Sequence, residues 1–208
     1  MALPQYLLMD LGGVMCEFRS THRLDRFARL AGITQDEVRE AIYGSDRAVR
    51  ADTGEIGAAT IRANLLSALG PAFPAAEFDA AWASAFAPST PVLALVGAVR
   101  RRLDAPRVGL FTNNDALLRD VLPAELPEVD EQVDTLLFSC DLGAMKPDRR
   151  VFERVLARIN VPAERVVFVD DSGKNVGGAA EVGIDSILFT GAEALADEFR
   201  VRGLVGNG

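Results

Sequence analysis

The stretch Tyr6-Leu-Leu-Met-Asp10-Leu-Gly-Gly-Val14 combines a short apolar run with an acidic residue and a glycine pair at its end. Four later runs have the same apolar, β-branched character, at residues 107–112, 135–140, 165–170 and 185–190. Near-continuous apolar runs of this length are typical of strands that are buried on both faces. We therefore predict five strands, the first at residues 6–10.

Helical patterns separate the later strands. In residues 148–159, for example, Val151, Val155, Leu156 and Ile159 fall on one face of a helix. Alternation of strand and helix favours a parallel sheet with helices on both of its faces. The predicted fold class is α/β, with a Rossmann-like doubly wound parallel sheet as its core.

The interval from residue 16 to residue 88 interrupts this alternation, because it contains helical patterns and no convincing strand. Thr34-Gln-Asp-Glu37 is a capping-box signature that opens one helix, and residues 58–69 and 75–86 supply two more helical patterns. We expect an all-helical insert. It would divide the chain into a core of residues 1–15 and 89–208 and an inserted domain of residues 16–88.

Polar residues stand where three of the predicted strands end: Asp10, Thr112 and the pair Asp170-Asp171. Lys146 adds a cation, and it is one of two lysines in a chain with 20 arginines. An ammonium is a compact point charge that suits a crowded anion site better than a wide guanidinium does. Because the carboxyl ends of parallel strands converge on one crevice, we expect these groups to meet there.

In this order the four motifs resemble those of the haloacid dehalogenase (HAD) superfamily of phosphatases, over residues 5–190. The resemblance implies that Asp10 is a nucleophile that forms an aspartyl-phosphate, which water then hydrolyses. It implies that Lys146 neutralises Asp10 and the phosphoryl oxygens, which Thr112 and Asn113 also hold. It further implies that residues 16–88 are a helical cap that closes over the site and selects the substrate.

A metal ion is expected at the acidic pair, because two adjacent carboxylates resist joint ionisation unless a cation neutralises them. Mg²⁺ prefers such hard oxygen ligands. The family pattern implies that the ligands are Asp10, the backbone carbonyl of Gly12 and Asp171, with Asp170 either a direct ligand or one step removed. One carboxyl, or Ser172, could also cap the helix that follows.

Gly12 departs from the pattern of many relatives, in which an Asp at this position protonates the leaving group and then activates water. Such acid–base help typically contributes about 10²- to 10⁴-fold in rate. Bacterial sugar-1-phosphate phosphatases that resemble this chain also carry glycine here. Glu17 and Asp115 are conceivable substitutes by location, although the sequence places neither within reach of the site.

Composition excludes several other classes of protein. The formal net charge of -8 argues against nucleic-acid binding, and no run of 18 apolar residues or signal-like N-terminus suggests a membrane. We expect a soluble, cytoplasmic protein. Cys16 and Cys140 give neither a disulfide framework nor metal-ligand spacing, and the single histidine, His22, makes a histidine-based triad improbable.

The sequence thus predicts a Mg²⁺-dependent phosphatase of a small phosphorylated metabolite such as a sugar phosphate. One alternative is a haloacid dehalogenase, which would use Asp10 on carbon without a metal; the Gly12-Gly13 pair and the acidic pair weigh against it. The other alternative is a catalytically weak HAD-like protein retained for binding or regulation, which the glycine at position 12 motivates.

Overall fold

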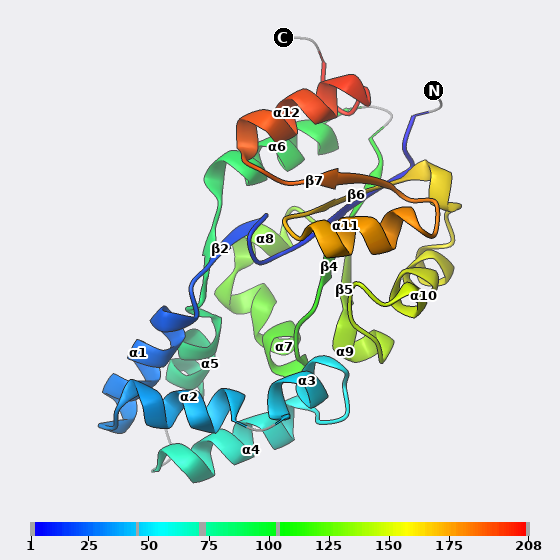
Figure 1. Cartoon of the computed structure of the whole chain (residues 1–208). Coiled ribbons are helices and arrows are strands. Elements are labelled where there is room, and N and C mark those ends of the chain that lie inside the picture. Colours follow the sequence, from blue (N-terminus) through cyan, green and yellow to red (C-terminus); the bar gives the residue numbers. More distant parts are fainter. Residues whose placement is uncertain (1–2, 45, 71–73, 103–104, 207–208) are drawn as a thin grey trace.

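The computed structural model describes residues 3–44, 46–70, 74–102 and 105–206 of the 208-residue chain. Five parallel strands form its central sheet, in the order β5-β4-β1-β6-β7 (Figure 1). They are β1 (Tyr6–Met9), β4 (Arg107–Thr112), β5 (Thr135–Phe138), β6 (Val166–Asp170) and β7 (Asp185–Leu188). The predicted α/β fold with a Rossmann-like parallel sheet is confirmed.

The first strand, β1, lies in the middle of the sheet and explains why its sequence is apolar throughout. It pairs in parallel with β4 on one side and with β6 on the other. Leu7 and Met9 pack into one hydrophobic cluster and Tyr6 and Leu8 into another, all four being fully buried. The twofold alternation of a strand therefore supplies two cores, one on each face of the sheet.

Helices cover both faces. One cluster receives side chains of α6 (Thr90–Arg100), α7 (Ala116–Glu125), α8 (Pro127–Asp130) and α12 (Ala192–Val201). The other receives side chains of α9 (Ser139–Leu142), α10 (Arg149–Ile159) and α11 (Gly173–Ala180), and the short 3-10 helix η1 (Ala163–Arg165) precedes β6. Within the described part of the chain, no helix has the combination of length and apolarity that a bilayer-crossing segment needs.

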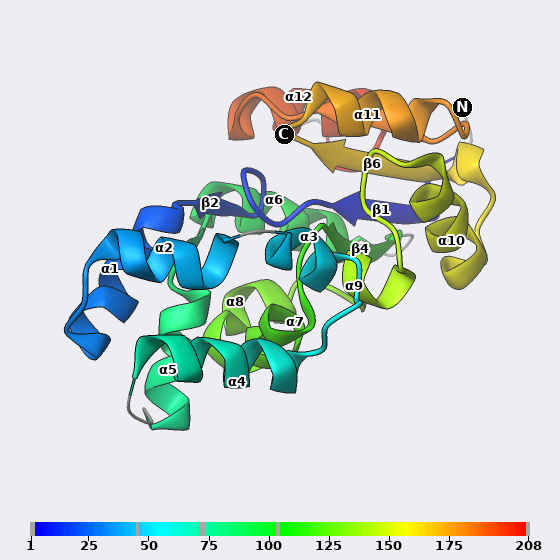
Figure 2. The same cartoon turned by 60° about the horizontal axis from the view of Figure 1, so that its bottom comes forward.

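Residues between β1 and α6 form a separate group of helices beside the sheet, coloured blue to green in Figures 1 and 2. These are α1 (Ser20–Ala31), α2 (Gln35–Tyr43), α3 (Arg47–Asp52), α4 (Ala58–Leu69) and α5 (Ala75–Ala83). The predicted capping box is present at the start of α2, where Thr34 and Glu37 exchange hydrogen bonds. Helix α4 has the bounds that the sequence predicted.

The prediction of an all-helical insert is wrong at both of its ends. Strands β2 (Cys16–Phe18) and β3 (Phe86–Pro88) pair antiparallel, so the helix predicted to run to Phe86 stops at Ala83. The rings of Phe18 and Phe86 pack together with centroids 5.1 Å apart. Each strand has three residues, which is too short for a period-2 pattern to be legible in the sequence.

Candidate active site

Lys146 lies at the centre of the candidate site and joins the ends of three strands. Its side chain is 1% exposed, and Nζ donates to Asp10 Oδ1 at 2.7 Å, Asp170 Oδ2 at 2.6 Å and the Phe111 carbonyl at 2.9 Å. Asp10 follows β1, Asp170 ends β6, and Phe111 lies in β4. Because these strands are neighbours and parallel, their carboxyl ends deliver all three acceptors to one ammonium.

A set of local hydrogen bonds holds Asp170 in place at the start of α11. Its Oδ1 accepts from the Ser172 backbone N–H at 2.9 Å and from Asn175 Nδ2 at 3.0 Å. Its Oδ2, which accepts from Lys146, also lies 3.1 Å from Asn175 Nδ2. The lone pairs of Asp170 are therefore largely occupied within the protein, whereas the Asp171 side chain has no hydrogen bond to another residue of the described structure.

Asp10 is buried with a raised proton affinity. Burial raises the pKa of its carboxyl to about 6; Lys146 opposes this shift, and the neighbouring Asp170 adds to it. Burial also raises the pKa of Asp171, with Asp170 again adding to the shift. Three neighbouring carboxylates, of which two are bonded to the one ammonium, form an acceptor-rich group with a deficit of positive charge.

Oxygen atoms of Asp10, Asp170 and Asp171 all lie within 4.8 Å of one another. Such an all-oxygen, multiply anionic set has the chemistry that a hard divalent cation requires. Gly13 permits this geometry, because a Cβ built there would lie 2.2 Å from Asp171 Oδ2 and the residue has φ +91°. Any other residue at position 13 would clash with Asp171 in a backbone conformation that favours glycine.

Gly12 lies under the aromatic pair of the β2–β3 ribbon. A Cβ at this position would stand 3.3 Å from Phe18 Cβ and 3.4 Å from Phe86 Cε1. The space that a side chain would enter is therefore tight but not closed, and Phe18 is itself 49% exposed. No local sequence pattern indicates that the two ends of the insert meet over this glycine.

The polar residues at and after the end of β4, Thr112 and Asn113, make different contacts. Thr112 is buried, and its hydroxyl accepts from Asn114 Nδ2 at 2.7 Å. The side-chain amide of Asn113 instead forms two hydrogen bonds with the backbone of Lys146. Its Oδ1 accepts from the Lys146 N–H and its Nδ2 donates to the Lys146 carbonyl, each at 2.8 Å. The Asn113 side chain thus positions the lysine, a contact that sequence spacing could not indicate.

These residues open onto a cavity of about 170 Å³. Its wall consists of residues that follow strands, residues of the β2–β3 ribbon and one residue of α11: Asp10, Gly12, Phe18, Phe86, Thr112, Asn113, Asn114, Lys146 and Asn175. The predicted residues Asp10, Gly12, Thr112, Asn113, Lys146, Asp170 and Asp171 are therefore brought together. Of the two conceivable acid–base substitutes, Glu17 is an exposed side chain paired with Arg19 at 2.7 Å, and Asp115 caps α7 through the Leu118 N–H.

The remaining residues that the sequence singled out do not line this cavity. Burial raises the pKa of Cys16 and of Cys140 to about 12, so both are protonated thiols at neutral pH. His22 is exposed near the start of α1, and Lys174 is exposed in the first turn of α11.

A second group of titratable residues lies between the helical insert and α7. Arg23 of α1 is 4% exposed and donates through Nε to the Trp82 carbonyl at 2.7 Å. Burial raises the pKa of Asp52 to about 7, with Asp115 adding to the shift and Arg23 opposing it, and burial also raises the pKa of Asp115. The feature of the sequence that points to this group is the position of Arg23, directly before Leu24 and four residues before Phe27, on the buried face of a helix.

Asp52 makes the stability of the protein depend on pH. The unfolded carboxyl ionises near pH 3.8 and the folded one near pH 7, so the folded state binds more protons between these values and stability falls as pH rises through this window. The free energy of unfolding of Asp52→Asn, relative to that of the wild type, should therefore be about 2 kcal/mol higher at pH 8 than at pH 5. Urea denaturation at both pH values measures this, with Asp36→Asn, whose side chain is 96% exposed, as control. An equal effect of Asp52→Asn at both pH values would contradict the assignment.

Comparison with known proteins shows which family the chain is similar to. The sequence profile described as haloacid dehalogenase-like hydrolase matches residues 5–183. Bifunctional epoxide hydrolase 2 of Rattus norvegicus is 34% identical over 98 residues, which are 45% of this chain and 18% of that protein. The matched part thus spans less than a fifth of that relative's length.

Solved structures share the fold over nearly the full chain. HAD family enzyme bt-2542 from Bacteroides thetaiotaomicron superposes with a TM-score of 0.74 and 22% identity, covering 96% of this chain and 100% of that one. Its complex with magnesium and inorganic phosphate gives a TM-score of 0.68 at 22% identity, covering 88% and 93%. L-2-haloacid dehalogenase from Xanthobacter autotrophicus, with chloropropionic acid covalently bound, gives 0.60 at 17% identity, covering 98% and 85%.

The profile covers most of the chain, and Asp10 and Asp170, from the first and last motifs, meet at the lysine of a third motif at the carboxyl edge of the sheet. The protein therefore belongs to the family of haloacid dehalogenase-like hydrolases.

Proposed function

We propose that this protein is a phosphatase that removes phosphate from a small metabolite, such as a sugar phosphate, through an aspartyl-phosphate on Asp10. The observation that carries the proposal is the buried Lys146 ammonium, bonded to both Asp10 and Asp170, beside the Asp171 carboxylate. A site that concentrates an ammonium, a cation-binding oxygen set and a carboxylate nucleophile suits a dianionic phosphoryl group. The complex of the bt-2542 enzyme with magnesium and inorganic phosphate supports this choice.

Asp10 performs the bond-forming step in this scheme. One oxygen of its carboxylate attacks phosphorus while the bond from phosphorus to the leaving oxygen breaks, and that leaving oxygen takes a proton from water. Water then attacks the aspartyl-phosphate, which releases inorganic phosphate and restores the carboxylate. Lys146, held by the Asn113 amide on its backbone, stays fixed against Asp10, and the Thr112 hydroxyl has its proton left to donate to a phosphoryl oxygen.

Mg²⁺ fits the oxygen set better at some of the acidic residues than at others. The Asp171 carboxylate accepts no hydrogen bond from another residue of the described structure, and Lys146 bonds only one oxygen of Asp10, whereas both oxygens of Asp170 accept hydrogen bonds from other residues. We assign Asp10, the Gly12 carbonyl and Asp171 as the residues that would hold Mg²⁺, with Asp170 fixing Lys146 beside them. The bound ion would supply positive charge that offsets the negative charge of the phosphoryl group.

Phosphate release tests the function directly. A panel of sugar phosphates, nucleotides and p-nitrophenyl phosphate, assayed with Mg²⁺ and with EDTA, should show turnover that depends on the metal. The similarity to L-2-haloacid dehalogenase favours halide release from 2-chloropropionate as the competing activity, and this would persist in EDTA. Metal-independent halide release without phosphate release would replace the phosphatase assignment.

A third possibility, a weakly catalytic binding or regulatory protein, remains a proposal because position 12 lacks an acid. A phosphoaspartate on Asp10 that forms but does not turn over would favour it, and multiple turnover on any ester would count against it.

Installing an acid at position 12 should speed the protein on poor leaving groups. Gly12→Asp would place a carboxyl at the position of the missing acid, and because its Cβ would stand 3.3 Å from Phe18 Cβ, strand β2 needs to shift by only a few tenths of an ångström. We expect about 10²-fold higher kcat/KM on alkyl phosphates and little change on p-nitrophenyl phosphate. Gly12→Asn is the matched control, since it has the same shape without the acid, and equal rates for the two variants would rule out acid catalysis from this position.

We further propose that residues 16–88 act as the cap over this site, separate from a core of residues 1–15 and 89–208. The support is that Phe18 and Phe86, at the two ends of the insert, line the cavity that contains Asp10. Binding of vanadate with Mg²⁺ should then slow amide hydrogen exchange in the insert. Exchange that is slowed only in the core would mean that the insert is a static layer.

A further inference from the structure

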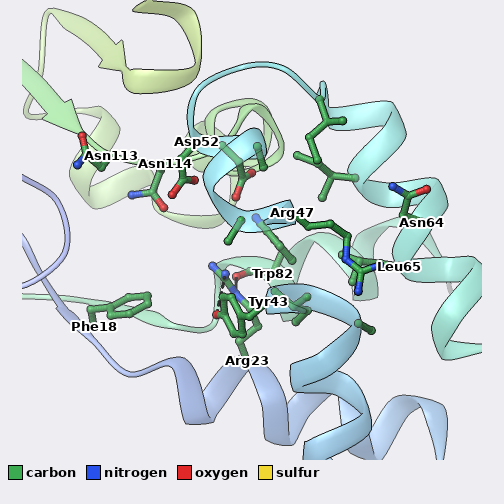
Figure 3. Close-up of a pocket in the computed structure, with 17 residues that line it drawn as sticks. Phe18, Arg23, Tyr43, Arg47, Asp52, Asn64, Leu65, Trp82, Asn113 and Asn114 are labelled. Atoms are coloured by element: carbon green, nitrogen blue, oxygen red, sulfur yellow. Dashed lines mark hydrogen bonds between the residues drawn. The ribbon is translucent and has the colours of Figure 1, made fainter. Parts of the chain in front are cut away.

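A second cavity adjoins the proposed active site. It also holds about 170 Å³, and Phe18, Asn113 and Asn114 belong to the walls of both cavities. At roughly 15 Å³ for each water-sized occupant, this is room for about ten water molecules, which is the size of a small metabolite. Figure 3 shows that its lining comes from the helical insert and from the loop after β4.

Arg23 presents an unused hydrogen-bond donor in this wall. Its Nε donates to the Trp82 carbonyl at 2.7 Å, its Nη1 lies 3.5 Å from the Tyr43 hydroxyl, and its guanidinium stacks 4.1 Å from the centre of the Trp82 ring. Nη2 is buried and has no hydrogen-bond partner. A buried charged donor without a partner is costly, so Arg23 is held ready for a group that the protein itself does not supply.

Asp52 presents an unused acceptor across the same cavity (Figure 3). Its carboxyl accepts no hydrogen bond from the residues that the structure describes. Arg23 lowers the Asp52 pKa, which places the two groups within electrostatic reach, yet no salt bridge joins them in the described structure. A donor and an acceptor thus face each other over a gap.

The wall of this cavity balances two cations, Arg23 and Arg47, with two acidic residues, Asp52 and Asp115, and the unpaired groups of Arg23 and Asp52 restrict what can fill the gap. A guanidinium can only donate hydrogen bonds and an ionised carboxylate can only accept them, whereas a hydroxyl does both. An anionic ligand would satisfy Arg23 but would add negative charge beside Asp52 and Asp115. These two carboxyls are already close enough for Asp115 to raise the pKa of Asp52. An alkyl group would leave both Arg23 and Asp52 unpaired.

Trp82 contributes a further polar atom to this wall. Its Nε1 is buried without a hydrogen bond of normal geometry, although the indole approaches Asp115 closely enough to lower that carboxyl's pKa. The apolar remainder of the wall, including Ile42, Ile61 and Leu65, can cover the carbon skeleton of a ligand. Polar groups on one part of a pocket and apolar groups on the rest are typical of small-molecule sites.

We propose that this second cavity binds the leaving group of the substrate, and that it selects a polyhydroxylated leaving group whose hydroxyls bridge Arg23 and Asp52. The proposal rests on the proposed phosphatase function, because it places the phosphoryl group at Asp10 and the rest of the substrate beyond Asn113 and Asn114. Arg23 and Asp52 are then specificity-determining residues.

Matched pairs of phosphate esters test the proposal. Glycerol 3-phosphate is paired with propyl phosphate, ribose 5-phosphate with tetrahydrofurfuryl phosphate, and glucose 6-phosphate with cyclohexylmethyl phosphate, so that each pair differs in hydroxyl groups over a similar carbon frame. The wild type should hydrolyse the hydroxylated member of at least one pair with about 10-fold higher kcat/KM or more. In Arg23→Met and in Asp52→Leu that preference should fall to near unity.

Asp52→Leu is the more decisive variant. Arg23 also donates a hydrogen bond to the Trp82 carbonyl, so its replacement can disturb the fold, whereas the Asp52 carboxyl accepts no hydrogen bond in the described structure. The proposal is overturned if no hydroxylated ester is preferred, or if the preference survives Asp52→Leu.

Failure of the phosphatase function would look different, since p-nitrophenyl phosphate and all six esters would then remain intact. In that event calorimetric binding of the same esters to Asp10→Asn decides the cavity separately. Hydroxyl-selective binding that Asp52→Leu removes would sustain the polyhydroxyl site without the reaction, and binding that is equal within every pair would overturn it.

Discussion

Asp10→Asn is expected to reduce phosphate release at least ~10⁴-fold while leaving the fold in place. The amide keeps an oxygen that can accept the hydrogen bond from Lys146 Nζ, now 2.7 Å from Asp10 Oδ1, so the local structure is preserved. It cannot act as the nucleophile, because an amide has neither the charge nor the basicity to form the phosphoryl bond. Stopped assays with p-nitrophenyl phosphate and with the best substrate of the panel measure the loss.

Two readouts show whether that loss is chemical. Acid quench of the wild type during turnover should trap one phosphoryl group on the peptide that contains Asp10, detectable by mass spectrometry, and Asp10→Asn should trap none. Its thermal midpoint should stay close to that of the wild type. A phosphoryl group found on another residue, or activity within tenfold of the wild type, would remove Asp10 from the nucleophile's role.

Lys146→Met is expected to destabilise the protein by about 3–5 kcal/mol at pH 8 and to abolish activity. The ammonium is 1% exposed and is the shared partner of Asp10 and Asp170, which are 7% and 0% exposed. Its removal leaves two buried carboxylates without a cation. It also raises the pKa of Asp10 further above its present value of about 6, because Lys146 is what opposes the effect of burial.

The sign of this effect gives a second check by pH. A carboxyl whose folded pKa is raised destabilises the folded state above that pKa and ceases to do so once it is protonated. The penalty of Lys146→Met should therefore be smaller at pH 5 than at pH 8 in urea denaturation, and added Mg²⁺ should restore part of the stability at pH 8.

Lys174→Met is the matched control, since Lys174 is the chain's other lysine and lies exposed on α11. It should change stability by no more than about 0.5 kcal/mol. If the two lysine variants were equally stable, the buried Lys146 ammonium would not stabilise the fold as its contacts indicate.

The same contrast between the two lysines shows how far local sequence reaches. Lys146 stands out in the sequence because the chain otherwise uses arginine, and its place after a predicted strand allows it to reach the carboxyl edge of the sheet. Lys174 stands two residues after the acidic pair's serine, yet it faces solvent. The difference follows from the start of α11, where Asn175 and not Lys174 turns toward Asp170.

Aromatic packing over Gly12 shows where sequence reasoning stops. Phe18 and Phe86 are 68 positions apart, and each belongs to a three-residue strand that has meaning only when it is paired with the other. A pattern in one short segment cannot report a partner that distant, so the insert was predicted to be helical to its ends. The amide of Asn113 is a similar case, because its bonds to the Lys146 backbone depend on two loops meeting.

By itself, the amino-acid sequence determined the parallel sheet, the order of its motifs and the identity of the residues at its carboxyl edge. These follow from strands buried on both faces, whose apolar runs and polar ends are local properties of the chain. Only the tertiary structure decided which carboxyl oxygens remain free, what covers Gly12, and that Arg23 and Asp52 face each other across a second cavity. Those features depend on distances between segments that are far apart in sequence, and no local pattern encodes them.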